Sequence, residues 1–167
     1  MTRLSRLFRL AALAAVATFL LIALGGLSRT QTGPGCPDWP LCQGGLLPPL
    51  DAAMVVDWLH RTVSASLGLL LLATAVVAGR TPGAAAGTRR AAWAAVGLLL
   101  LQSGIGALTV GVAPAWASTL HLGLAMLLFA ATLLTLLAAG LDRGAPGWLA
   151  GSADPVLRRA ALVGAAA

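Results

Sequence analysis

Four long apolar stretches constrain the fold of this chain more than any other feature of its sequence. They cover residues 10–27, 55–78, 91–110 and 118–141. Each is long enough to cross the hydrocarbon core of a bilayer, which takes about 20 residues at 1.5 Å per residue. Within lipid such segments are helical, because their backbone polar groups need partners inside the segment. We therefore predict an all-α polytopic membrane protein, a bundle of four transmembrane helices.

Composition points to the same class of protein. The 167 residues are 59% hydrophobic and 10% charged, and a soluble domain of this size could not bury so much apolar surface in one core. The first stretch also has features of a secretory signal, since arginines precede it. Its apolar run is longer than the apolar region of a usual signal peptide, which has about 7 to 15 residues, and no clear cleavage site precedes Arg29. We interpret it as a retained helix.

The arginines predict the topology. All 11 basic residues are arginines, and nine of them precede the first stretch, follow the fourth, or lie between the second and third. By the positive-inside rule, the N- and C-termini are cytoplasmic, and loops 28–54 and 111–117 are outside. The predicted location is the cell membrane, surrounded by lipid. This distribution accounts for the net charge of +6, so we expect no nucleic-acid partner. The nine are Arg3, Arg6, Arg9, Arg80, Arg89, Arg90, Arg143, Arg158 and Arg159.

Both cysteines lie in the predicted outer segment "RTQTGPGCPDWPLCQGG", residues 29–45. Thiols on an oxidising face are normally paired, and the five residues between Cys36 and Cys42 allow a small closed loop. We predict a disulfide, either structural or redox-active. Zinc is disfavoured, because a four-ligand site would need both histidines, and these lie in separate spans.

The two histidines are candidate haem ligands. His60 and His121 lie a few residues inside the second and fourth stretches, which both run inward, so we expect similar depths. Ionisable residues within a span usually face the bundle interior, and neutral imidazole is a good iron ligand. The alternative is two histidines hydrogen-bonded across the bundle. Small residues one or two turns away would leave room for a macrocycle: Ser64, Gly68, Ala117 and Ala125.

Charged residues near His60 are further candidates. Asp57 precedes His60 by three residues and shares its helical face, where a carboxylate could exchange protons. Its alternative role is a helix N-terminal charge favoured by the dipole. Arg29 and Arg61 could pair with haem propionates or extend to the lipid headgroups. The third stretch is interpreted as a packing scaffold with small residues at its surface, and its Gln102 and Thr109 could hydrogen-bond across it.

Four segments together resemble the N-terminal half of the heme A synthase family. They are "GGLSRTQTGPGCPDWPLC" (25–42), "DWLHR" (57–61), "LQSGIGALTV" (101–110) and "TLHLGLAMLLF" (119–129), and the resemblance covers about residues 10–140. It implies a haem-binding four-helix bundle, a Cys36–Cys42 disulfide, and His60 and His121 facing the haem. The implied reaction oxidises the C8 methyl of haem O to the formyl group of haem A. The implied partners are haem O, an electron donor and, as a candidate, haem O synthase.

Three departures from the family pattern affect these expectations. The family usually has glutamate where this chain has Asp57, which is one methylene shorter, so the carried-over catalytic role is in question. The segment before Cys36 is about one residue short. Family members typically have eight spans in two similar halves, and the other half carries a haem b cofactor. This chain has four complete spans.

The C-terminal sequence bears on the domain organisation. "RRAALVGAAA" at 158–167 resembles "RRAAWAAVGLL", which opens the third stretch at residue 89. We therefore expect residues 1–143 to form the haem-binding bundle, and 144–167 to form a cytoplasmic loop and the start of a truncated fifth helix. Two copies pairing as a homo-oligomer would recreate the double bundle.

These features are compatible with three functions. The leading one is a haem-modifying oxidoreductase of haem A biosynthesis, or its substrate-haem-binding half. The first alternative is a non-catalytic bis-histidine cytochrome b subunit, since two histidine ligands would saturate the iron. The second is a membrane thiol oxidase, which a single cysteine pair argues against, because a disulfide relay normally needs two pairs.

Overall fold

The computed structural model describes residues 2–30, 35–108 and 115–144. Its helices are α1 (Arg3–Thr30), α2 (Ala52–Arg80), α3 (Ala86–Ala107) and α4 (Ala115–Asp142). All four are long and apolar enough to cross a membrane. The predicted all-α, four-helix membrane architecture is confirmed. The predicted fifth helix at 158–167 lies outside the described residues.

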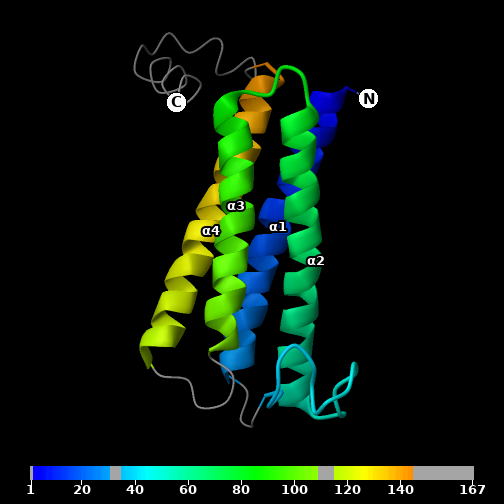
Figure 1. Cartoon of the computed structure of the whole chain (residues 1–167), viewed down its shortest axis with the longest axis vertical. Helices are drawn as coiled ribbons and strands as arrows, with labels where there is room; N and C mark the ends of the chain where they lie inside the picture. Colours follow the sequence, from blue (N-terminus) through cyan, green and yellow to red (C-terminus); the bar gives the residue numbers. More distant parts are fainter. Residues whose placement is uncertain (1, 31–34, 109–114, 145–167) are drawn as a thin grey trace.

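The four helices run along one common axis (Figure 1), and the pairs that pack together close a ring. α1 packs against α2 and α4, and α3 packs against the same two helices, so α2 and α4 face each other across a diagonal. The start of α1, the α2–α3 connection and the end of α4 share one end of the bundle, which we call the arginine end. The segment 35–51 lies at the opposite end, here called the loop end. Which end faces the cytoplasm stays a prediction.

Except at the end of α3, the helices extend beyond the apolar stretches that predict them, because helical hydrogen bonding continues into the flanking residues. α2 begins where the Asp51 carboxylate accepts the N–H groups of Ala53 and Met54, at 3.0 and 3.1 Å. A side-chain acceptor at this position satisfies donors that the first helical turn leaves free. α3 ends at Ala107, before the predicted end at residue 110.

A carboxylate from α4 caps the start of α3. No side chain of the N-cap residue Ala85 serves this function. Instead, Asp142 Oδ2 accepts the Ala85 N–H at 3.2 Å and the Thr88 hydroxyl at 2.7 Å. A negative charge is favourable at a helix N-terminus, so this contact joins α3 and α4 at the arginine end.

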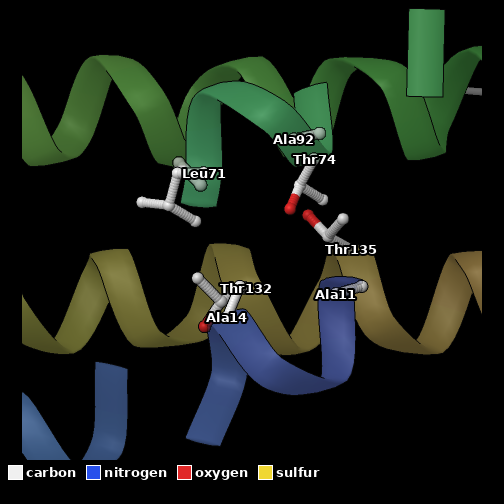
Figure 2. Close-up of a pocket in the computed structure, with 8 residues that line it drawn as sticks. Ala11, Ala14, Leu71, Thr74, Ala92, Thr132 and Thr135 are labelled. Atoms are coloured by element: carbon white, nitrogen blue, oxygen red, sulfur yellow. The ribbon is translucent and has the colours of Figure 1, made fainter. Parts of the chain in front are cut away.

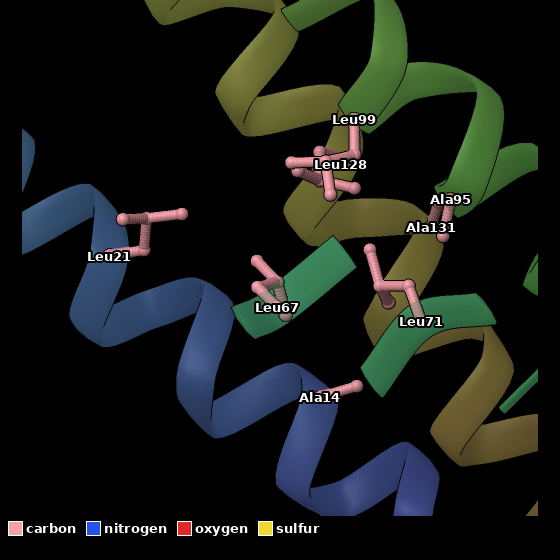
Figure 3. Packing of buried hydrophobic residues seen from close by; sticks show 8 residues of the cluster. All are labelled: Ala14, Leu21, Leu67, Leu71, Ala95, Leu99, Leu128 and Ala131. Atoms are coloured by element: carbon pink, nitrogen blue, oxygen red, sulfur yellow. The ribbon is translucent and has the colours of Figure 1, made fainter. Parts of the chain in front are cut away.

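The interior is filled by small and aliphatic side chains. Figure 3 shows one cluster of buried residues, contributed by all four helices: Ala14, Leu21, Leu67, Leu71, Ala95, Leu99, Leu128 and Ala131. Towards the arginine end, alanines and threonines meet between the helices (Figure 2). The hydroxyls of Thr74 and Thr135 donate to carbonyls of their own helices at 2.7 and 2.8 Å. The remaining space is too small for a water molecule, so a large ligand would have to bind nearer the loop end.

Candidate functional site

His60 and His121 lie at similar depth in the half of the bundle nearer the loop end. At 1.5 Å per residue, His60 is about 12 Å from the start of α2 and His121 about 9 Å from the start of α4. Both helices begin at the loop end and lie on one diagonal of the ring. The matched depth predicted from the sequence is confirmed.

Each imidazole rests against a glycine of the neighbouring helix. A Cβ added at Gly25 of α1 would lie 3.0 Å from Cε1 of His60. One added at Gly106 of α3 would lie 3.0 Å from Cε1 of His121. The same contact therefore occurs in the α1–α2 pair and in the α3–α4 pair. Each glycine lets a histidine ring lie directly against a helix backbone.

The ring nitrogens leave hydrogen-bonding capacity unused. Nδ1 of His60 and Nδ1 of His121 are buried and have no hydrogen-bond partner among the described residues. The Nε2 atoms of His121 and Gln102 are 3.3 Å apart, and the Gln102 Oε1 is also buried and has no partner within the described part of the chain. An unsatisfied buried polar group costs about 1 to 3 kcal/mol, so such groups are typical of a site completed by a ligand.

This donor set suits a metal that brings its own equatorial ligands. Within the described ranges, no group of three or more His, Cys, Asp or Glu side chains could hold a bare metal ion. A haem iron needs one or two axial ligands from the protein, and a neutral imidazole with a free nitrogen is suitable. Haem therefore fits the chemistry of His60 and His121.

Two of the contacts to His121 come from α3. The sequence pattern of this stretch indicates a packing scaffold, yet Gln102 and Gly106 both contact the imidazole. Their four-residue spacing places them on one helical face, and this spacing could have predicted that they contact the same partner. Gly68, expected beside the macrocycle, packs against α3 instead, since a Cβ there would lie 3.3 Å from Leu99.

Asp57 and Arg61 attach the disulfide loop, residues 36–42, to α2. Arg61 Nη2 lies 2.8 Å from Asp57 Oδ2, and the same oxygen accepts the Cys36 N–H at 2.9 Å. The Arg61 guanidinium also donates to the carbonyls of Cys36 at 3.1 Å and Leu41 at 3.0 Å, and to that of Asp38. The side chains of Arg61 and Asp57 are only 14% and 21% exposed, so water screens this network weakly. We call these two residues the loop clamp.

The clamp requires a glycine before the first cysteine. A Cβ at Gly35 would lie 2.8 Å from Asp57 Oδ2, which is closer than real Cβ contacts come. Next to it, Cys36 and Cys42 form the predicted disulfide, with an S–S distance of 2.05 Å, and both are buried. In the loop-entropy estimate, closing so short a loop contributes about 2 kcal/mol to stability.

Asp38 organises the interior of the disulfide loop. Its carboxylate accepts the N–H groups of Gly44 at 2.7 Å and Gln43 at 2.6 Å. These hydrogen bonds, that from Gly44 first, lower the pKa of Asp38 below its usual value. Gln43 and Gly44 both have positive φ, at 53° and 72°, which turns their N–H groups towards the carboxylate.

The predicted site residues therefore fall into two groups. His60 and His121 lie in the bundle, and Arg29 lies in the last turn of α1. Asp57 and Arg61 instead direct their polar atoms to the loop. The assignments of Asp57 to catalysis and of Arg61 to haem propionates stay predictions.

Comparison with known proteins identifies the family. The profile described as "COX15-CtaA: Cytochrome oxidase assembly protein" matches residues 8–167. The chain belongs to the COX15-CtaA family. Members similar to it include the Heme A synthase of Bacillus licheniformis, 35% identical over 119 residues, covering 69% of this chain and 39% of that protein. The Heme A synthase of Symbiobacterium thermophilum is 36% identical over 136 residues, covering 79% of this chain and 44% of that protein.

A second class of relative also matches. The Protoheme IX farnesyltransferase of Halobacterium salinarum is 37% identical over 127 residues, which cover 75% of this chain and 28% of that protein. No solved structure matches the chain. The chain spans about two fifths of the length of the two COX15-CtaA synthases named above.

Proposed function

We propose that this chain is the haem O-binding half of a haem A synthase, a membrane oxidoreductase that converts a methyl group of haem O to the formyl group of haem A. Buried Nδ1 atoms on His60 and His121, at matched depth on diagonal helices, are the main support. Membership of the COX15-CtaA family supports a role in haem A biosynthesis.

Haem O is the proposed substrate. The family relatives are named for the synthesis of haem A, and another relative is named for the farnesylation of protohaem IX. The side chains that fill the interior are mainly aliphatic, which suits an apolar substrate. A haem b cofactor, an electron donor and haem O synthase as a partner are further proposals, as is a second copy or second half that completes the enzyme.

Each site residue has a proposed role. His60 and His121 bind the iron, while Gly25 and Gly106 hold the two rings against the helix backbones. Arg29, in the last turn of α1 at the loop end, pairs with the propionates. Arg61 already donates to carbonyls of the loop, so its guanidinium would have to release one of them before it could pair with a propionate. The bound haem O would supply the methyl group that is oxidised, and the redox chemistry that these side chains lack would come from a separate haem cofactor.

Asp57 is proposed to accept a proton during the oxidation. Converting the methyl group to a formyl group breaks C–H bonds and needs an external oxidant, and a carboxylate one turn before His60 is placed to exchange protons in those steps. Its Oδ2 is occupied by Arg61 and the Cys36 N–H, and neither hydrogen bond uses Oδ1. Asp57 would then combine proton transfer with anchoring of the disulfide loop.

A bis-histidine cytochrome b is the second candidate, favoured by the same pair of histidines. Two imidazoles on diagonal helices could saturate an iron that only carries electrons. Saturation of the iron does not argue against a haem A synthase if the ligated haem is the substrate and not the oxygen-activating cofactor.

The type of haem bound tests the proposal. The full chain is purified from membranes that make haem O, and the extracted haem is identified by chromatography and mass spectrometry. We expect haem O or haem A in the extract. Haem b alone would support the cytochrome, and the absence of any haem would contradict both functions.

A further inference from the structure

A groove lies between α1 and α2 at the arginine end, away from the histidines. It has a volume of about 320 Å³ and is lined by Arg3, Arg6, Val76, Val77, Arg80 and Thr81. Three of these six residues are arginines, and none is acidic. Guanidinium groups that share a groove repel one another, so the arrangement is most favourable when an anion is bound.

The three arginines come from both helices. Arg3 and Arg6 are one helical turn apart on α1, and Arg80 is the last residue of α2. The Arg3 guanidinium reaches across the groove and donates to the Arg80 carbonyl at 3.4 Å. In the described part of the chain, the Arg6 side chain has no hydrogen-bond partner, and it is exposed. At least one guanidinium is therefore available to a ligand.

Two other arginines at this end are engaged within the fold. Arg89 donates to the Ala84 carbonyl at 2.6 Å, and the Arg143 guanidinium lies 4.3 Å from the centre of the Phe8 ring. Among the described residues, Asp142 is the carboxylate at this end, and its Oδ2 accepts from Ala85 and Thr88. The groove thus keeps its positive charge without a counter-ion among the residues that the structure describes.

Position in the bilayer identifies the class of anion. α1 and α2 have 28 and 29 residues, whereas about 20 span the hydrocarbon core, so the groove at their ends lies at headgroup depth. Below it, the outer face of α2 carries Leu69, 73% exposed, and Leu72, 44% exposed, and it leads to Val76. An apolar chain could lie along this face while a phosphate contacts the arginines.

We propose that this groove is a binding site for the phosphate of an anionic phospholipid. Guanidinium groups bind phosphate oxygens in a bidentate manner, and basic pockets between membrane helices favour anionic headgroups. The proposal does not depend on haem chemistry, because the groove and the histidines lie at opposite ends of the bundle.

The test measures retention of lipid by the purified full chain, using native mass spectrometry with dioleoylphosphatidylglycerol as the probe and dioleoylphosphatidylcholine as the neutral comparison. We expect preferential retention of the anionic lipid, weakened about tenfold in the double variant Arg6→Gln/Arg80→Gln. Arg6→Gln alone should weaken it less, and this exposed position keeps the test valid if the double variant folds poorly. Arg90→Gln, an equal charge change at an exposed α3 position outside the groove, should have no effect.

Three outcomes would overturn the proposal. If Arg90→Gln reduces retention as much as Arg6→Gln does, the lipid responds only to overall charge. If millimolar inorganic phosphate displaces the anionic lipid and itself stabilises the parent protein to the same extent, the groove is a site for free phosphate. Equal retention of the two lipids by the parent protein would also contradict a phosphate-selective site.

Discussion

Asp57 and Arg61 form an ion pair of 2.8 Å, and the Asp57 oxygen in that pair also accepts the Cys36 N–H. The pair thereby ties the disulfide loop to the helix turn that leads to His60. Two roles for Asp57 follow from this geometry, namely anchoring the loop and accepting a proton. Substitution of each partner in turn separates them.

Asp57→Asn should keep haem bound while haem A formation falls about a hundredfold, because the amide retains the size of the side chain but cannot accept a proton. Asp57→Glu, which restores the residue usual in the family, should keep activity. The measurement is haem A content in membranes that make haem O, with the remainder of the enzyme supplied.

Arg61→Gln provides the matched comparison. It removes the ion pair and the bonds to the loop carbonyls but leaves the Asp57 carboxylate in place. We expect the loop to become more sensitive to reductant and protease, since losing a charged hydrogen bond costs about 1 to 3 kcal/mol. Haem A formation should fall less than tenfold. An equal loss in both variants would mean that Asp57 acts only through the loop.

Gly25→Ala and Gly106→Ala should each weaken haem retention several-fold. The added methyl group would lie 3.0 Å from a histidine Cε1, so the ring has to shift, and overpacking of this kind costs about 1 to 3 kcal/mol. Gly26→Ala and Gly104→Ala are matched controls, because a Cβ at either position meets nothing within 4 Å. The idea fails if the controls lose haem to the same extent.

Asp38 should make the disulfide loop sensitive to acid. Hydrogen bonds from Gly44 and Gln43 lower the pKa of Asp38, so its ionised carboxylate stabilises the loop at pH values above the usual pKa of 3.8. That contribution declines as the pH falls from 3.8 through the lower folded-state pKa. The amide resonance of Gly44 should titrate with a midpoint below 3.8, and Asp38→Asn should abolish the titration. A midpoint at or above 3.8 would contradict this assignment.

Membrane orientation can be measured independently of the haem chemistry. A reporter fused after Gly140 should be cytoplasmic, and one inserted in the 44–50 loop should be outside, because arginines concentrate at the Gly140 end of the bundle. Paired alkaline phosphatase and green fluorescent protein fusions report the two sides. The reverse pattern would place the disulfide loop in the cytoplasm and remove the reason for expecting it to be oxidised.

The bundle itself could be predicted from the sequence, because a bilayer allows few structures for long apolar segments. The helix ends could not, since some depend on distant residues. Asp142, for example, caps α3 across 57 positions of sequence. Matched depth of His60 and His121 followed from topology and spacing alone.

The surroundings of the histidines were harder to predict. Contacts of Gly25 with His60 and of Gly106 with His121 depend on how neighbouring helices rotate about their axes, which apolar patterns do not define. The four-residue spacing of Asp57 and Arg61 on one helix does predict their ion pair. Their attachment to Cys36 depends on the path of the loop, and nothing in the local sequence specifies that path.

Haem retention by histidine variants tests the central claim most directly. His60→Ala and His121→Ala are purified alongside Leu59→Ala and Leu120→Ala, the same kind of truncation at the preceding, exposed positions. The haem-to-protein ratio is measured from the absorption spectrum after expression in membranes that make haem O. We predict that each histidine variant loses most of its haem, about tenfold or more, while both leucine variants retain it. Retention of haem by both histidine variants at the level of the leucine controls would contradict the claim that His60 and His121 bind the haem.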